Sequence, residues 1–136
     1  MRLPNYDKYP STKYEGFIEV GWESIRKVIS SFDGVVAVDL YTGTYEDEIA
    51  SALSDGFDEV VLTRDLMKPE EEVGAMTAPF MTDDVLFGHV TCLGIRDFFR
   101  AGALAESAAR LKAPGSRVLV LGPGASLAAP EDALLV

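Results

Sequence analysis

Short apolar runs alternate with amphipathic stretches along most of the chain. Residues 35–40 and 118–121 are almost continuously apolar, which is typical of strands buried on both faces of a parallel sheet. Elsewhere apolar residues recur at spacings of three and four, as in helices that cover a sheet. The alternation predicts an α/β fold with three layers, helix–sheet–helix, and a mainly parallel sheet of four or five strands.

Several segments have the length and composition of strands. They are residues 17–20, 35–40, 60–62, 118–121 and, in one interpretation, 133–136. In the other interpretation the chain is a fragment, because an apolar segment is only beginning where the sequence stops. We favour the fragment, and we expect an extended N-terminal arm at 1–16 before a single, truncated α/β domain at 17–136.

Three segments have helical spacing. Residues 22–32 form the first, and the second follows Thr44, a candidate N-cap whose neighbours Glu46 and Asp47 suit the first turn of a helix. The longest predicted helix spans 95–112, where apolar residues share one face. Residues 67–83 show no period, so we expect a long loop there.

Composition narrows the class of protein. Among 136 residues, 12 lysines and arginines face 22 acids, which gives a net charge of −10 and disfavours nucleic-acid binding. No apolar run approaches the roughly 18 residues of a membrane span, and no signal peptide is visible. Cys92 is the only cysteine, so there is no disulfide framework. We expect a cytoplasmic protein without a membrane partner.

Polar side chains and glycines cluster where three predicted strands end and in one loop. The candidate ligand-binding residues are Asp39, Tyr41, Gly43, Arg64, Asp65, Asp84, Gly122, Gly124 and Ser126. Because the carboxyl ends of parallel strands meet at one edge of a sheet, most of them should lie close together. An arginine, a glycine-rich turn and several acids would suit a phosphorylated ligand held with the help of Mg²⁺.

Each of these signals also has a purely structural interpretation. The stretch GPGAS lacks the lysine of a P-loop and the third glycine of a dinucleotide fingerprint, so Gly122 and Gly124 could simply permit a turn. Asp39 could be a loop or cap residue, and Asp84 could belong to a solvated turn. Arg64 and Asp65 could form a surface ion pair of little energetic value.

The sequence offers no catalytic constellation. His89 is the only histidine, whereas a zinc site needs three or four ligands. A serine–histidine–acid triad would lack the G-x-S-x-G elbow. We therefore assign no catalytic residue and no metal held by the protein alone, and we expect His89 to be structural.

Five short motifs occur in an order that resembles a known bacterial family. They are NYDKYP, VDLYTGTYEDEI, TDDVLFGH, DFF and VLVLGPGASL. This order resembles the N-terminal region of long proteins of the class I mannose-6-phosphate isomerase family, in which Thr42 would commonly be a proline. The isomerase chemistry of that family belongs to a zinc-binding cupin barrel, which a single histidine cannot supply. The resemblance implies an α/β domain that precedes a C-terminal cupin domain.

Two hypotheses about function follow. In the first, the chain is a non-catalytic or regulatory domain of an isomerase-like protein and binds a phosphorylated small molecule or its neighbouring domain. In the alternative, it is a kinase-like phosphotransferase that acts on a nucleoside or sugar with Mg²⁺ and Asp39 or Asp84, although the missing lysine disfavours this. An assembly module without a ligand is the third option, and a homodimer through an exposed edge strand is a candidate assembly.

Overall fold

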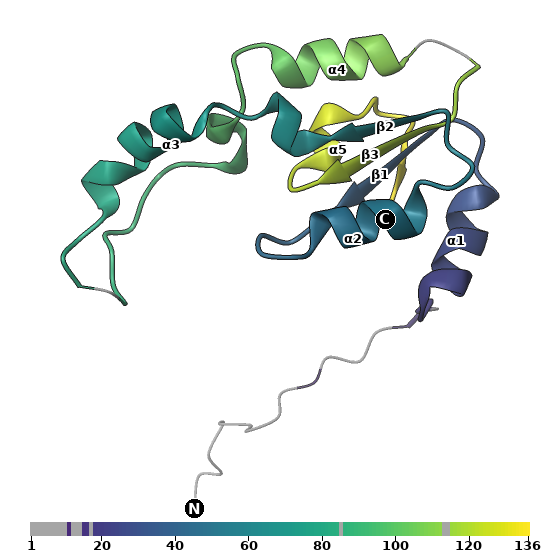
Figure 1. The fold of residues 1–136 in the computed structure, drawn as a ribbon, viewed down its shortest axis with the longest axis horizontal. Helices are drawn as coiled ribbons and strands as arrows, with labels where there is room; N and C mark the ends of the chain where they lie inside the picture. The colour runs from purple at the N-terminus through teal and green to yellow at the C-terminus, as the bar shows by residue number, and fades with distance from the viewer. Residues whose placement is uncertain (1–10, 12–14, 17, 85, 113–114) are drawn as a thin grey trace, which may run out of the picture.

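Four parallel strands form the centre of the molecule in the order β2–β3–β1–β4 (Figure 1). The computed structural model describes residues 11, 15–16, 18–84, 86–112 and 115–136. The strands are β1 (Val35–Asp39), β2 (Glu59–Leu62), β3 (Val118–Gly122) and β4 (Leu134–Leu135). The predicted α/β fold with a parallel sheet is confirmed.

Helices cover both faces of this sheet. Helices α1 (Trp22–Ser30) and α2 (Glu46–Leu53) lie on one face, and α4 (Ala103–Leu111) and α5 (Ala125–Ala128) lie on the other (Figure 1). Helix α3 (Glu70–Thr77) extends away from the sheet and has no buried residue. The molecule therefore has the expected three layers, with one helix outside them.

The core consists of two apolar clusters, one on each face of the sheet. Alternate residues of a strand point to opposite faces, so Val36 and Leu119 face α1 and α2, whereas Ala37 and Val120 face α4 and α5. These four residues are fully buried. The uninterrupted apolar runs of β1 and β3 follow from this burial on both sides.

The register places the ends of the two central strands side by side. Asp39 of β1 lies opposite Gly122 of β3, and Leu40 N donates a hydrogen bond to Gly122 O at 3.3 Å. At the outer edge, β4 pairs with β1, and Val136 N donates to Ala37 O at 2.9 Å. The carboxyl ends of β1, β2 and β3 therefore meet along one edge, which we call the carboxyl edge.

The prediction of a long loop at 67–83 was wrong. This segment contains α3 and the 3-10 helix η2 (Ala78–Phe80). Pro69 precedes the first helical residue, and Glu70 to Glu72 occupy the first turn, where acids interact well with the helix dipole. Since the helix buries no side chain, it has no apolar stripe that could have revealed it.

The prediction of a single helix over Ile95–Lys112 was also wrong. The segment divides into the 3-10 helix η3 (Ile95–Phe98), an extended Phe99 and α4. Gly102 precedes α4 in the left-handed conformation, with φ of 79°. Both Phe99 and the bend at Gly102 interrupt a pattern that looked continuous in the sequence.

Two smaller predictions also failed. Residues 18–20 do not form a strand, and Phe17 lies outside the described residues, as does most of the expected 1–16 arm. Thr44 does not cap α2: its hydroxyl donates to Tyr41 O at 3.0 Å, and Tyr45 occupies the cap position. The hydroxyl of Thr44 therefore tightens the preceding turn.

Candidate functional site

The carboxylate of Asp39 is held by the backbone of the Gly-Pro-Gly turn. Its Oδ1 atom accepts a hydrogen bond from Gly124 N at 2.7 Å. Its Oδ2 atom accepts one from Ser126 N at 3.1 Å and another from the Ser126 hydroxyl. The chain's own carboxylate therefore occupies the N–H groups that could have cradled an external phosphate.

This arrangement fixes an exposed carboxylate at the carboxyl edge. Asp39 is solvent-exposed, whereas Gly124 is buried and adopts the left-handed conformation with φ of 75°. A carboxylate has about four lone-pair sites, so Asp39 retains acceptor capacity beyond its three bonds to the turn. It is available to a cation or to a hydroxyl donor.

A hollow of about 300 Å³ lies beside Asp39. It is lined by Asp39, Leu40, Tyr41, Thr42, Ile95, Pro123, Gly124, Ser126 and Leu127. The Tyr41 side chain is 86% exposed at its rim. Four of the residues expected from the sequence, Asp39, Tyr41, Gly124 and Ser126, are thus brought together around one space.

Arg64 belongs to an adjoining cluster of charges. Its guanidinium pairs with Asp47 Oδ1 at 2.7 Å and with Glu46 Oε2 at 3.1 Å. The hydrogen bond to Asp47, with the charges of Glu46 and Asp65, holds the pKa of Arg64 above its usual value. Because two acids already neutralise it, Arg64 is a poor partner for a free phosphate.

Gly122 is enclosed by two polar side chains. Glu46 Oε1 and Thr63 Oγ1 are buried and have no hydrogen-bond partner among the described residues. A Cβ atom at Gly122 would collide with Thr63 Oγ1 and lie 2.6 Å from Glu46 Oε1, and its φ of 128° also favours glycine. Close approach therefore requires glycine at position 122.

Glu46 and Thr63 also lie at the carboxyl edge, although they were not among the candidates predicted from the sequence. Thr63 directly follows β2 and begins the 3-10 helix η1 (Thr63–Leu66), so its place after a predicted strand was the available signal. Glu46 was assigned only to the first turn of a helix. Its contact with Arg64, 18 residues away, depends on how β1 and β2 are arranged in the sheet.

Three other predicted residues contribute differently. Asp65 offers its backbone oxygen to Arg100 Nη2 at 2.6 Å. Asp84 Oδ1 accepts hydrogen bonds from Leu86 N at 2.8 Å and Phe87 N at 3.2 Å, so its contacts lie within its own turn. Gly43 has φ of 93° and open space around its Cα atom.

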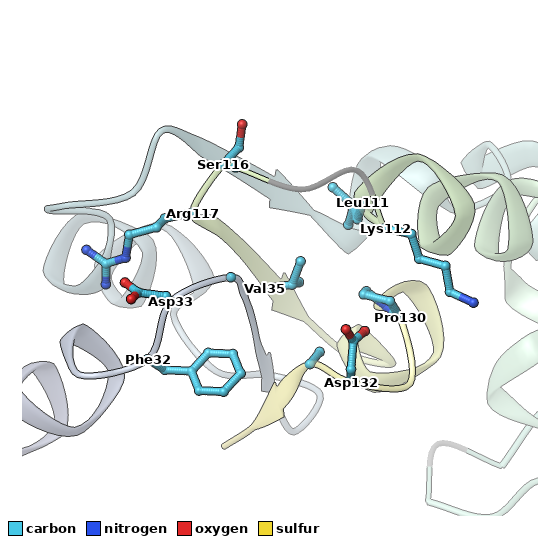
Figure 2. Close-up of a pocket in the computed structure, with 12 residues that line it drawn as sticks. Phe32, Asp33, Val35, Leu111, Lys112, Ser116, Arg117, Pro130 and Asp132 are labelled. Atoms are coloured by element: carbon cyan, nitrogen blue, oxygen red, sulfur yellow. The ribbon is translucent and has the colours of Figure 1, made fainter.

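A larger hollow of about 500 Å³ lies at the opposite, amino edge of the sheet (Figure 2). Asp33 and Arg117 lie on one side of it, and Lys112 and Asp132 lie on the other. Arg117 is committed to structure, because it donates to Gly56 O at 2.8 Å. This hollow contains none of the predicted ligand-binding residues and has balanced charges.

Within the described part of the chain, no group of three or more His, Cys, Asp and Glu side chains is placed to hold a metal ion. Among the same residues, no helix has the length and apolar character needed to span a membrane.

Residues 21–136 match the family model described as domain of unknown function (DUF8485). The chain belongs to the DUF8485 family. In this DUF8485 member the match covers every element from α1 to β4, including the whole carboxyl edge. No curated protein matches the chain. No solved structure matches it. The resemblance to mannose-6-phosphate isomerases therefore stays a prediction.

Proposed function

We propose that this chain is a non-catalytic or regulatory α/β domain that binds a phosphorylated small molecule, as its Mg²⁺ complex, at the carboxyl edge. The domain would belong to a mannose-6-phosphate isomerase-like protein and adjoin a cupin domain. The observation that carries the proposal is the Asp39 carboxylate, which the Gly-Pro-Gly turn holds beside an open hollow.

The charges at this edge favour a metal complex over a free anion. Asp39, Glu46, Asp47 and Glu48 all lie near the carboxyl ends of the strands, and Arg64 is neutralised by two of them. A free phosphate would be repelled, and its natural N–H donors are already paired with Asp39. Mg²⁺ is commonly held by one or two carboxylates together with phosphate oxygens and water. One exposed carboxylate is therefore a suitable contribution from the protein.

The contacts support binding more than turnover. A general base must reach the proton that it removes, and a transferred phosphoryl group needs fixed positive charge around it. Asp39 already accepts three hydrogen bonds. The guanidinium of Arg64 is paired with Glu46 and Asp47. We therefore assign Asp39 to ligand binding and assign no catalytic residue.

One observation favours the second candidate, a Mg²⁺-dependent phosphotransferase. Glu46 Oε1 and Thr63 Oγ1 are buried oxygen atoms without a partner among the described residues, and both lie against Gly122. Such oxygens could hold a further water or cation near a nucleotide. Phosphoryl transfer from ATP to a sugar or nucleoside would favour this candidate over the first.

Isothermal titration calorimetry with mannose 6-phosphate, with and without Mg²⁺, tests the proposal. We expect heat of binding only when Mg²⁺ is present, and we expect Asp39→Asn to abolish it because the amide lacks the charge that attracts the metal. Asp33→Asn is the matched control, since it removes an equal charge at the amino edge. Binding without Mg²⁺, or equal loss in both variants, would contradict the proposal.

A further inference from the structure

The hollow beside Asp39, of about 300 Å³, is lined mostly by apolar side chains; we call it the Asp39 hollow. The apolar members of its lining are Leu40, Tyr41, Ile95, Pro123 and Leu127. A Mg²⁺ ion and a phosphate group are bound through oxygen atoms, N–H groups and water, and they gain nothing from such side chains. The lining therefore indicates that the ligand also has an apolar part.

The apolar lining comes from three separate parts of the chain. Leu40 and Tyr41 follow β1, and Leu127 belongs to α5. Ile95 begins η3 and lies close to the glycine-rich turn, because its Cγ1 atom is 3.4 Å from the place that a Cβ atom of Gly124 would take. The missing side chain at Gly124 thus lets Ile95 approach, and the three parts surround one space.

Tyr41 presents an aromatic ring at the rim of the Asp39 hollow, where 86% of its side chain is exposed. The backbone that carries this ring is held in a turn. Tyr41 O accepts hydrogen bonds from Thr44 N at 3.3 Å and from the Thr44 hydroxyl at 3.0 Å. Stacking a flat ligand on an exposed aromatic ring is favourable, and a fixed backbone lowers the entropy cost of binding. Tyr41 is therefore suited to stack on a ring of the ligand.

The polar side chains around the Asp39 hollow favour a planar base over a sugar ring. They belong to Asp39, Thr42 and Ser126. Asp39 already accepts three hydrogen bonds, one of them from the Ser126 hydroxyl, so few partners remain for the many hydroxyl groups of a hexose. Burying a hydroxyl group without a partner costs free energy, whereas the two faces of a nucleobase stack without hydrogen bonds. A base can therefore be bound here at a lower cost.

We propose that the phosphorylated ligand of the carboxyl edge is a nucleotide, whose base stacks on Tyr41 in the Asp39 hollow. This inference rests on the proposed function, in which Mg²⁺ at Asp39 holds the phosphate end of the same molecule. The acids of this edge repel a free phosphate, but they do not repel a base, which is neutral at pH 7. The base and the metal complex thus supply two separate parts of the binding free energy.

Titration with adenosine monophosphate and with ribose 5-phosphate, each with Mg²⁺ in excess, tests this proposal, because the base is the main difference between the two ligands. Amide NMR shifts would report both the affinity and the position of each ligand. We expect adenosine monophosphate to bind about tenfold more tightly than ribose 5-phosphate. Its base should also shift the amide signals of Leu40, Ile95 and Leu127. Mannose 6-phosphate should bind like ribose 5-phosphate.

Replacing Tyr41 separates stacking from binding of the phosphate. Tyr41→Ala should lower the affinity for adenosine monophosphate to that for ribose 5-phosphate, and it should leave ribose 5-phosphate binding unchanged. Tyr45→Ala is the matched control, because Tyr45 is 80% exposed and lines the neighbouring hollow with Glu46, Asp47 and Arg64. It should change neither affinity. Equal affinities for the two ligands in the native chain, or equal losses in the two variants, would overturn the proposal.

Adenosine, which has no phosphate, distinguishes a failure of this inference from a failure of the proposed function. Adenosine binding that Tyr41→Ala weakens would support the base site, even where ribose 5-phosphate fails to bind and contradicts the proposed function. If ribose 5-phosphate binds with Mg²⁺ and adenosine monophosphate binds no more tightly, the proposed function stands and the base site is wrong. If none of the three ligands binds, both proposals are wrong.

Discussion

Gly122 is the residue at which the carboxyl edge is most crowded. It ends β3 with a positive φ, and two buried side-chain oxygens approach the place where a Cβ atom would stand. The sequence shows a glycine after a strand, which could equally permit a simple turn. Thr63 directly follows β2 and Glu46 is the first residue of α2, so their close approach to Gly122 is invisible in the local sequence.

Replacing Gly122 with alanine should lower the free energy of unfolding by about 3 kcal/mol, because strain at positive φ adds to the collision with two side chains. Gly43→Ala is the matched control, since Gly43 also has positive φ but no atom lies within 4 Å of the place that its Cβ atom would take. It should cost about 1 kcal/mol. Urea denaturation measures both, and equal losses would show that crowding at Gly122 is unimportant.

Asp39 is a second residue that the chain depends on for local structure. Substitution by alanine leaves the buried N–H of Gly124 without its acceptor and should cost about 2 kcal/mol. Asp39→Asn keeps an acceptor oxygen and should cost less. Thermal and urea unfolding would measure the free energy of unfolding of both variants. An asparagine variant as unstable as the alanine variant would contradict this prediction.

Asp39 and Gly124 could each be selected from the sequence, but their pairing could not. They are 85 residues apart and meet because β1 and β3 are neighbours. The sequence predicts that strand ends share an edge without giving the strand order. The same limit explains why Arg64 was a phosphate candidate, although it is paired with Glu46 and Asp47.

The elements of the core could be predicted because a buried strand has a continuous apolar run and a helix packed on a sheet has an apolar stripe. Strands β1 and β3 are covered on both faces, and α1 and α2 each pack one side on the sheet. Helix α3 was missed because it packs on nothing that would impose a period. The bend at Gly102 was missed because the apolar residues on either side of it fit one helical pattern by coincidence.

Residues 68–98 leave the α/β core and return to it at the bridge between Met67 and Phe99, and removing most of this segment should leave the core folded. Replacing residues 70–93 with a short glycine–serine linker keeps the bridge between Met67 and Phe99 and removes no residue described as buried. We expect the free energy of unfolding to change by about 1 kcal/mol or less. Urea denaturation of both chains measures the change. A large loss would mean that the segment supports the core.

For the molecule as a whole, the two edges of the sheet differ in character. At the carboxyl edge, Asp39 and Glu46 line two separate hollows, whereas the amino edge balances Asp33 and Asp132 against Lys112 and Arg117. The strand–helix alternation was enough to predict that one edge would collect most, but not all, of the candidate residues, since Asp84 lies in a turn of its own. It could not predict that the chain would occupy its own anion cradle with Asp39.

We propose that a divalent cation binds at Asp39, and paramagnetic broadening by Mn²⁺ would locate it. Added with mannose 6-phosphate, Mn²⁺ should selectively broaden the amide signals of Gly124 and Ser126, and Asp39→Asn should remove this effect. The amides of Asp33 and Asp132 at the amino edge should stay sharp. Broadening at the amino edge, or at the acidic first turn of α3, with Gly124 and Ser126 unaffected would show that the cation does not bind at Asp39.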